Sequence, residues 1–344
     1  MTTNEALAKP RPNMTDVARH AGVALGTVSN VLNNPEKVSE RTRRKVSAAI
    51  AELGYIRNDA ARSLAAGQST TVGLVVADLG NSFFVDIARG TERLLRLSGM
   101  NVLIANTDVD PAREVQNLEL FERSRVAGIL FAPLDTPLAT AGTLPVHSTP
   151  TVLVNAPAPN PAYAGVAVDE IYGGSLAAQH LLDLGRRRFV FVGGPMFLSA
   201  VKDRYTGVAH TAAEGGATVS VIETTGLGIR HGRVAAEGIS SRDPYTYDAI
   251  VCASDLLAIG VIDGLRGQHG FDVPGDLLVT GYDDNHFASE SAVPITTVSQ
   301  PGEEMGRAAA ELLLQEMSGA PTGSPSMSLR PHLIPRRSTL GGTA

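Results

Sequence analysis

Hydrophobic and polar residues follow two different periods along this chain. Between residues 14 and 53 the apolar side chains recur every three or four positions, which predicts short amphipathic helices. From Thr71 onward, short continuous apolar runs alternate with stretches of helical period. Such runs are typical of strands that are buried on both faces of a parallel sheet. The pattern therefore predicts a small helical head followed by a larger α/β body.

The head begins with two short helices that are separated by a turn at Gly22. Asn13 and Asp16 have the spacing of a capping box at the start of the first helix. The second helix buries its valines and leaves four residues outward: Leu25, Gly26, Ser29 and Asn30. A helix-turn-helix of this kind places its second helix in the major groove of DNA. An ordinary helical hairpin inside a core is the alternative.

A third amphipathic helix over 40–53, with Ser39 as its N-cap, completes the head. The short stretch that follows favours a helix but has a single large apolar residue, Leu64. So short a helix needs a partner in order to persist in water. We therefore divide the chain into four parts: a flexible arm (1–12), a helix-turn-helix domain (13–57), a hinge helix or linker (58–68) and a body (69–344).

The body alternates predicted strands with predicted helices. Strands are expected at 72–79, 102–106, 127–133, 151–155, 189–193, 219–223, 248–253, 277–282 and 296–299. Helices are expected at 83–98, 112–124, 170–184, 200–214, 231–239, 255–268 and 302–318. This alternation predicts two doubly wound parallel sheets, one in an N-subdomain (about 70–167 plus 299–325) and one in a C-subdomain (about 168–298). Such sheets bind ligands beyond the carboxyl ends of their strands.

The end of the chain carries weaker signals. The stretch 319–326 is rich in Pro, Gly and Ser and is expected to be a loop. The last residues are expected to pack as a tail or to fray.

Charge is distributed unevenly between head and body. The 344-residue chain has a formal charge of -6, yet residues 9–68 hold ten Lys/Arg against five Asp/Glu. A basic head on an acidic body fits phosphate contacts at one end only. A basic helix face that simply meets solvent is the alternative for the segment 41–45.

Other features limit the function classes. The single cysteine, Cys252, allows no intrachain disulfide and lies in an apolar run typical of an inert core position. No apolar run reaches the roughly 20 residues that span a bilayer, and the N-terminus lacks an apolar signal core. The chain has no paired cysteines, no His-Glu-x-x-His and no phosphate-binding loop. We therefore expect a cytoplasmic protein with no membrane partner, no metal and no cofactor.

Short motifs run through the chain in a characteristic order. In the head they are Asp-Val-Ala at 16–18, Ala-Gly-Val at 21–23, Thr-Val-Ser at 27–29, Val-Leu-Asn at 31–33, Val-Ser-Glu-Arg-Thr at 38–42, Leu-Gly-Tyr at 53–55 and Ala-Arg-Ser-Leu at 61–64. In the body they are Asn-Ser-Phe-Phe at 81–84, Val-Asp-Glu at 168–170, His-Leu-Leu-Asp-Leu-Gly at 180–185, Arg-Tyr-Thr-Gly at 204–207, Ser-Asp at 254–255, Gly-Tyr-Asp-Asp at 281–284 and Thr-Thr-Val-Ser-Gln-Pro at 296–301. Each is weak alone, but together they resemble the LacI/GalR family of bacterial transcription regulators over roughly residues 13–340.

The resemblance implies a dimeric repressor of a pseudo-palindromic, double-stranded DNA operator. The body would have the fold of a periplasmic binding protein and would sense a small molecule. In the family, paired hinge helices enter the minor groove and wedge a leucine into the central base step. Leu64 holds that place here, and anchoring the head to the body is its alternative role. The implied DNA-binding residues are Leu25, Gly26, Thr27, Ser29, Asn30, Asn33, Ser39, Thr42, Asn58 and Leu64.

Four positions depart from the commoner family pattern. Ala24 stands where the N-cap of the second helix is often Ser, and Asn30 replaces a frequent Arg. Gly26 offers no side chain at a base-contacting position, and Arg57 replaces a common Pro before the hinge. These departures leave the base preference open.

In the body, the resemblance implies a ligand cleft with polar and apolar walls. The implied polar residues are Asn81, Asp169, Arg204, Ser254, Asp283 and Gln300, and the apolar wall consists of Phe83 and Phe84. This mixture suits a sugar or a sugar derivative. Helix capping or ion pairing is the alternative role of Asp169 and Asp283. Ligand binding would change the angle between the subdomains, and so the spacing of the paired hinge helices.

Other functions remain open at this stage. An enzyme is disfavoured because the adjacent carboxylates Asp283 and Asp284 point to opposite faces of a strand. A transport binding protein shares the body fold but has an export signal and no basic head. A regulator controlled by a protein partner, or by a nucleoside or purine, has the same architecture. The end of the chain has no leucine heptads, so a dimer is expected rather than a tetramer.

Overall fold

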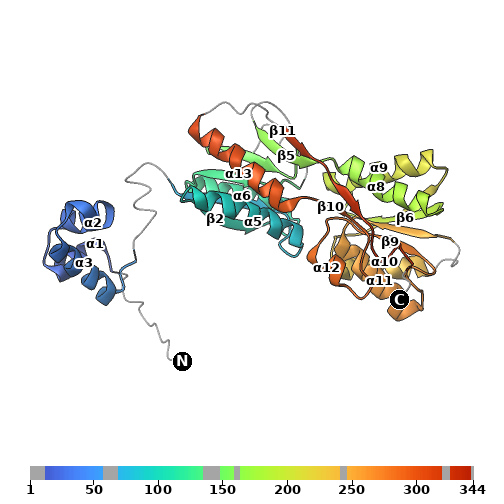
Figure 1. Cartoon of the computed structure of the whole chain (residues 1–344), viewed down its shortest axis with the longest axis horizontal. Helices are drawn as coiled ribbons and strands as arrows, with labels where there is room; N and C mark the ends of the chain where they lie inside the picture. The colour runs from blue at the N-terminus through green and yellow to red at the C-terminus, as the bar shows by residue number, and fades with distance from the viewer. Residues whose placement is uncertain are drawn as a thin grey trace, which may run out of the picture. The chain divides into compact units, whose positions relative to one another are not determined.

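The computed structural model of the chain describes residues 12–56, 69–134, 148–158, 163–240, 246–319 and 326–341. They belong to two compact units that divide after Gln68. Figure 1 shows a small unit made of helices and a larger unit made of strands and helices.

The head is a bundle of three α-helices. They are α1 (Met14–Ala21), α2 (Leu25–Asn33) and α3 (Glu40–Leu53), with a short 3-10 helix η1 (Pro35–Lys37) between the last two. The core consists of the side chains that the helical period turns inward: Val17, Ala18, Val28, Val31, Val46 and Ala49. Because burial of apolar surface is the main favourable term in folding, this small core holds the three helices together.

Local signals determine where α1 and α2 begin. The Asn13 side chain accepts hydrogen bonds from the backbone N–H groups of Thr15 and Asp16, and the Asp16 carboxylate accepts one from the Asn13 N–H. This is the predicted capping box. At the start of α2 the N-cap is Ala24, which makes no side-chain hydrogen bond. Since a capping side chain contributes about 1 kcal/mol, α2 begins less firmly than α1.

The N-subdomain is built on a parallel six-stranded sheet in the order β11-β5-β4-β3-β1-β2. The strands are β1 (Thr71–Val76), β2 (Asn101–Asn106), β3 (Gly128–Phe131), β4 (Thr151–Val154), β5 (Ala164–Val168) and β11 (Ser326–Leu329). Helices α5 (Ser82–Leu97) and α13 (Gly302–Ser318) pack on one face, and α6 (Pro111–Arg123) packs on the other. The strand order reverses between β1 and β3, where such sheets bind ligands.

The sequence pattern does not predict two strands of this sheet. β5 is a short run of Ala, Gly and Val, whose small side chains give a weak strand signal. Ser326, placed in the expected loop 319–326, begins β11, which pairs in parallel with β5. The sequence of β11 is half polar because the strand lies at the edge of the sheet. The N-subdomain therefore extends beyond the expected limit at residue 325.

The C-subdomain has a parallel four-stranded sheet in the order β7-β6-β8-β9. Its strands are β6 (Arg188–Gly193), β7 (Thr218–Glu223), β8 (Ala249–Cys252) and β9 (Leu278–Thr280). Helices α8 (Glu170–Asp183) and α9 (Ser199–Glu214) lie on one side of the strands, and α10 (Ile229–Ser240) and α11 (Asp255–His269) lie on the other (Figure 1).

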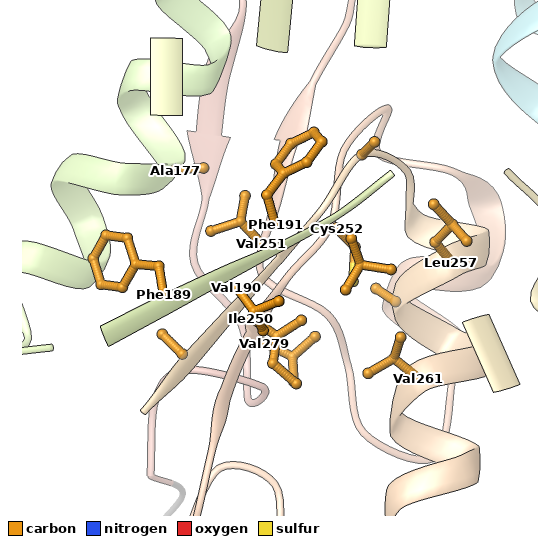
Figure 2. Close-up of a cluster of buried hydrophobic side chains, with 14 of the residues drawn as sticks. Ala177, Phe189, Val190, Phe191, Ile250, Val251, Cys252, Leu257, Val261 and Val279 are labelled. Atoms are coloured by element: carbon orange, nitrogen blue, oxygen red, sulfur yellow. The ribbon is translucent and has the colours of Figure 1, made fainter. Parts of the chain in front are cut away.

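Apolar side chains from both sides meet on the central strands of this sheet. Figure 2 shows Phe189, Phe191 and Val251 near Ala177 of α8, with Leu257 of α11 on the opposite side. Cys252 lies in the same cluster and is buried, which confirms its expected core position. Burial raises the pKa of its thiol, so the thiol stays protonated.

The chain crosses between the subdomains three times. It leaves the first sheet after β5, returns from β10 (Thr297–Ser299) into α13, and crosses again from β11 to β12 (His332–Ile334). β12 pairs antiparallel with β10, and Ser338 then hydrogen-bonds Val279 of β9. Packing and fraying are both expected for the last residues; within the described part, Ser338 and Thr339 are buried. A short helix, α12 (His286–Glu290), follows β9.

None of the helices in the described ranges is long and apolar enough to cross a membrane. In the same part of the chain, no three His, Cys, Asp or Glu side chains are grouped so that they could hold a metal ion.

Candidate nucleic-acid interface and ligand cleft

The outer surface of α2 is uncharged. Leu25 is 49% exposed at the first position of the helix, and Gly26 and Asn30 are exposed one turn apart. Thr27 and Ser29 are half-buried at the flanks of this surface. The structure thus places these predicted DNA-binding residues on the outer surface of the helix, over a core of valines.

Other predicted DNA-binding residues hydrogen-bond within the head. The Asn33 carboxamide donates to the Ser29 hydroxyl at 3.2 Å. Ser39 caps α3 by accepting from the Thr42 N–H, and the Ser39 and Thr42 hydroxyls lie 2.9 Å apart. These bonds hold the polar groups in place, so a backbone phosphate would meet an ordered surface. Asn58, Leu64 and Arg57 lie outside the described residues.

The third helix of the head carries exposed basic side chains. Arg43 and Arg44 of α3 both pair with Glu40, and Arg41 and Lys45 are exposed. Exposed ion pairs contribute little to stability, so Arg43 and Arg44 can exchange Glu40 for phosphate at small cost. The basic segment is thus free to meet phosphates, and contacts of that kind carry no sequence information.

A cleft of about 330 Å³ lies between the two subdomains of the body. Its walls come from the carboxyl ends of β1, β3, β4 and β5, from the starts of α8 and α9, and from β11. Six of the predicted ligand-binding residues line it: Asn81, Phe83, Phe84, Asp169, Arg204 and Asp283. The volume suits a small molecule.

Asn81 joins the subdomains at the edge of the cleft. Its side chain caps α5 by accepting from the Phe83 N–H, as the strand-to-helix turn after β1 requires. The same carboxamide donates to Asp283 at 2.6 Å and accepts from Asn285 at 3.0 Å. All three side chains are buried or nearly so, and the two partners belong to the C-subdomain. Asn81 therefore lines the cleft and also connects the two subdomains.

Arg204 is buried and bound on most sides. Its guanidinium forms a bidentate pair with Glu170, at 2.9 Å for both bonds, and donates to the Ala253 carbonyl at 2.7 Å. It lies 3.4 Å from Asp283 and stacks over the Tyr282 ring at 3.8 Å. Burial alone would lower its pKa, but Glu170 and Asp283 more than offset this, so its pKa is raised. Arg204 is thus a permanent cation that is already neutralised.

Asp283 connects these groups at the base of the cleft. It accepts from Gln300 at 2.7 Å and from Asn81, and its backbone has a φ of 103°, a conformation that L-residues rarely adopt. Burial raises the pKa of its carboxyl, while Arg204 and the hydrogen bond from Asn81 act in the opposite direction. Strained backbone of this kind is concentrated at functional sites.

Two of the predicted ligand-binding residues, Ser254 and Gln300, are not part of the cleft wall. Ser254 caps α11 by accepting from the Leu257 N–H, and its hydroxyl donates to the Leu227 carbonyl at 2.8 Å. Gln300 lies behind Asp283 and orients it. Both lie behind the cleft wall, where Ser254 holds the Leu227 backbone and the Gln300 Nε2 holds Asp283. Leu227 itself does line the cleft.

Sequence reasoning missed four carboxylate or carboxamide residues of the cleft: Asp78, Asn155, Glu170 and Asp203. Glu170 follows Asp169 and pairs with Arg204, and Asp203 precedes Arg204 on α9. Asn155 ends the strand predicted over 151–155, so its position at a carboxyl end could have identified it.

The environments of two of these residues are unusual. The Asn155 Oδ1 is buried without a hydrogen-bond partner in the described part of the chain, and its backbone φ is 57°. Burial, followed by the charge of Glu170, raises the pKa of Asp203, while Lys202 acts in the opposite direction. The Asn155 Oδ1 is a group that a ligand could satisfy, because unpaired buried polar atoms are costly.

The aromatic wall is formed by neighbouring rings. Phe83 and Phe84 meet edge to face with their centroids 5.2 Å apart. Phe83 is buried among the residues under α5 and α13, and Phe84 is half-buried. Asp169, which also lines the cleft, is exposed and caps α8 through the Tyr172 N–H. Asp169 therefore has both roles that were considered from the sequence: it caps a helix, and it lines the cleft.

Known proteins match both parts of the chain. Residues 13–58 match the profile of bacterial regulatory proteins of the lacI family, and residues 178–339 match the periplasmic binding protein-like domain. The ribose operon repressor of Escherichia coli is 33% identical over 328 residues, which cover 94% of this chain and 99% of that protein.

Solved structures show the same similarity. The lac repressor dimer bound to operator and an anti-inducer has a TM-score of 0.78 and 25% identity, and covers 96% of this chain and 100% of that one. The complex of the transcriptional regulator CelR with cellobiose has a TM-score of 0.68 and 31% identity, with coverage of 95% and 100%. With a helix-turn-helix head, a two-subdomain body and full-length similarity, this chain belongs to the LacI family of bacterial regulatory proteins.

Proposed function

We propose that this protein is a cytoplasmic, dimeric transcriptional repressor of a pseudo-palindromic operator. Its affinity for the operator is set by a small molecule that binds between the subdomains of the body. The observation that carries the proposal is the presence, in one chain, of a helix-turn-helix with an exposed second helix and of a two-walled cleft of about 330 Å³. A related repressor is a dimer on its operator. Two-fold symmetry of the protein requires two matching half-sites in the DNA.

The cleft supports a sugar or a sugar derivative as the effector. Asp78 and Asp169 each use one carboxylate oxygen to accept a backbone N–H, and the Asn155 Oδ1 has no partner in the described residues. These groups accept hydrogen bonds, and sugar hydroxyls donate them. Phe84 offers an apolar face for a ring. CelR, a relative, is known in complex with cellobiose.

The charges of the cleft disfavour an anionic effector. The described lining residues include five carboxylates, those of Asp78, Asp169, Glu170, Asp203 and Asp283. Arg204 is the one cation in that set, and Glu170 and Asp283 already neutralise it. A phosphate group in this cleft would lie near carboxylates of the same charge and would find no unpaired cation among the described lining residues. The cost of removing the phosphate from water would therefore not be offset. We therefore infer an effector without negative charge.

The hydrogen bonds between the subdomains provide a route for coupling. Asn81 of the N-subdomain bonds Asp283 and Asn285 of the C-subdomain, and the His286 N–H donates to the Ser82 hydroxyl at 3.1 Å. Asn81 and Asp283 also line the cleft. A ligand that favours one angle between the subdomains changes operator affinity only by its differential affinity for the two states.

We assign no catalytic residues. Asp283 bonds Asn81 and Gln300, whereas Asp284 pairs with Arg336 at 2.6 Å. The two adjacent carboxylates thus have separate partners and do not share a site where a proton could be transferred. The matched relatives are transcriptional regulators.

Operator selection tests the proposal directly. Purified protein would be used to select sites from random duplexes, and the dependence of binding on salt would then be measured. We expect a roughly palindromic site with a central C-G step, and an affinity that falls steeply with salt because phosphate contacts release counterions. No enriched sequence together with a shallow salt dependence would contradict the proposal.

The ligand is tested on the same protein. Neutral sugars and nucleosides, each compared with its own phosphate ester, would be screened by thermal shift and then added to the operator complex. We expect stabilisation by a neutral member, no stabilisation by its phosphate, and a change in operator affinity. Preferential binding of the phosphate esters would contradict the inferred charge preference.

A further inference from the structure

The helix that faces DNA has no charged side chain. Its sequence, Leu25–Asn33, contains no Lys, Arg, Asp or Glu. Bidentate contacts from Arg or Lys are the commonest way in which proteins recognise guanine in the major groove. Base recognition by α2 therefore depends on apolar, hydroxyl and carboxamide groups only.

The side chains of α2 are not equally available to DNA. Val28 and Val31 are buried in the core of the head, and the Ser29 hydroxyl accepts a hydrogen bond from Asn33. Thr27 is half-buried. Only two exposed side chains of the helix remain without such a bond in the described residues: the apolar Leu25 and the carboxamide of Asn30.

Gly26 makes Asn30 accessible. Side chains of a helix lean toward its N-terminus, so the Asn30 side chain extends over the position one turn earlier, which is Gly26. Gly26 has no side chain, and a Cβ placed there would have nothing within 4 Å. Open space therefore lies one turn before the exposed Asn30, and no side chain at position 26 blocks the approach of a base pair to it.

The chemistry of a carboxamide distinguishes adenine from guanine. In the major groove adenine presents an acceptor, N7, and a donor, the N6 amino group. The Asn30 Nδ2 and Oδ1 match these as donor and acceptor. Guanine presents two acceptors there, so the Asn30 Oδ1 would face an unmatched oxygen or nitrogen. An exposed leucine, in turn, fits the C5 methyl group of thymine and no other group in the groove.

We propose that α2 recognises A·T base pairs, with the Asn30 carboxamide bound to adenine and the Leu25 side chain in contact with a thymine methyl group. This inference rests on the proposed function and specifies the class of DNA half-site. Any guanine in the operator is then recognised by parts of the protein other than α2. A bidentate contact such as that of Asn30 with adenine discriminates against a wrong base by about 5- to 150-fold.

The test is operator selection with the full-length wild type and three variants: Asn30→Ala, Asn30→Arg and Leu25→Ala. We expect the wild type to select an adenine that Asn30→Ala no longer distinguishes, with discrimination at that base pair reduced by about 5- to 150-fold. Asn30→Arg should select guanine at the same position. Leu25→Ala should lose preference for thymine at a different base pair.

Glu36→Gln serves as the matched control, because Glu36 is exposed just beyond α2, and it must leave the base preference unchanged. Asn30 is exposed, so its variants should retain the melting temperature of the wild type. Guanine in the wild-type site at the base pair that responds to Asn30, or identical sites for wild type and Asn30→Ala, would overturn the inference. If no protein enriches any sequence, the DNA-binding function itself fails and this inference with it.

Discussion

At the scale of single residues, the interior of the body is notable for its buried charges. Arg204 is neutralised by Glu170 and lies close to Asp283, and all three are less than 10% exposed. Its motif predicts that this arginine lies at the cleft, but not that it is bound on most sides. The partner, Glu170, is an unremarkable residue in the sequence, since only the packing of α8 against α9 brings it to Arg204.

Loss of Glu170 should strongly destabilise the body. The variant Glu170→Ala leaves the buried guanidinium of Arg204 without its bidentate partner. Breaking a buried ion pair by removing one member costs about 3–5 kcal/mol. Urea denaturation would measure the change in unfolding free energy. The exposed pair of Glu214 with His210 provides the control, since Glu214→Ala should change stability by less than about 1 kcal/mol. Equal effects of the two substitutions would contradict this prediction.

Asp255 should make stability depend on pH. Burial, and then the charge of Asp283, raises the pKa of its carboxyl well above the usual value. Above the unfolded-state pKa of about 3.9, the folded protein keeps a proton that the unfolded chain has lost. The unfolding free energy therefore falls as the pH rises toward the folded-state pKa.

The measurement is urea denaturation from about pH 4 to about pH 8. Asp255→Asn cannot titrate, so its unfolding free energy should fall less steeply with rising pH than that of the wild type. Asp263→Asn, at an exposed carboxylate of the same helix, should follow the wild type. Parallel curves for wild type and Asp255→Asn would show that Asp255 does not titrate in this range.

At the scale of elements, two strands differ from the rest of their sheets. β2 ends the six-stranded sheet and β7 ends the four-stranded sheet. Both expose apolar side chains, with Leu103 at 52% and Val221 at 41%. Exposed apolar edges invite association and are normally covered in native proteins. We expect the second copy in the dimer to cover both edges.

Charged residues on these edges should separate the dimer. The double variant Leu103→Glu/Val221→Glu should sediment as a monomer and bind operator about 100-fold or more weakly, because two linked half-site contacts become independent. Leu184→Glu, at an exposed leucine after α8, should remain dimeric. Circular dichroism would confirm that all variants are folded. A dimeric double variant would place the interface elsewhere.

The sequence predicts elements well where the hydrophobic period is long and poorly where a strand is short. The helices of the head and the central strands follow their pattern because each carries enough apolar residues in its own sequence to show that it is buried. β5 and β11 depend on pairing between residues far apart in the chain, Gly165 with Ser326 and Val168 with Leu329. The hydrophobicity of a short segment does not show whether that segment pairs with a distant strand. A motif likewise does not show which side chains reach the cleft. Ser254 and Gln300 belong to motifs of the site, but neither lines the cleft.

At the scale of the whole molecule, the body is one unit made of two interwoven halves. Three chain crossings and a set of buried hydrogen bonds connect the N-subdomain to the C-subdomain. The His286 Nε2 of the C-subdomain also lies 3.2 Å from the Asp86 carboxylate of the N-subdomain, at the surface. We therefore expect the angle between the halves to depend on these groups, among which Asn81 bonds two residues of the other half.

Removal of the Asn81 side chain should weaken the response to the effector. Asn81→Ala removes the hydrogen bonds that Asp283 and Asn285 make with the N-subdomain. Loss of such buried bonds costs about 1–3 kcal/mol of stability. We expect the ratio of operator dissociation constants with and without effector to move toward one. Electrophoretic mobility shift at saturating effector would measure it. Arg93→Ala, which removes an exposed contact within the N-subdomain, is the control. An unchanged ratio in Asn81→Ala would exclude this bridge from the coupling.

The three crossings also affect how such a protein can be recombined. A gene cut at one point cannot exchange one half of the body for that of a relative, because each half is assembled from separate stretches of the chain. The head, by contrast, is continuous in sequence and joins the body through a single segment. New pairings of operator and effector therefore arise most readily by swapping heads between whole sensors, while a new sensor must evolve by substitution within the cleft.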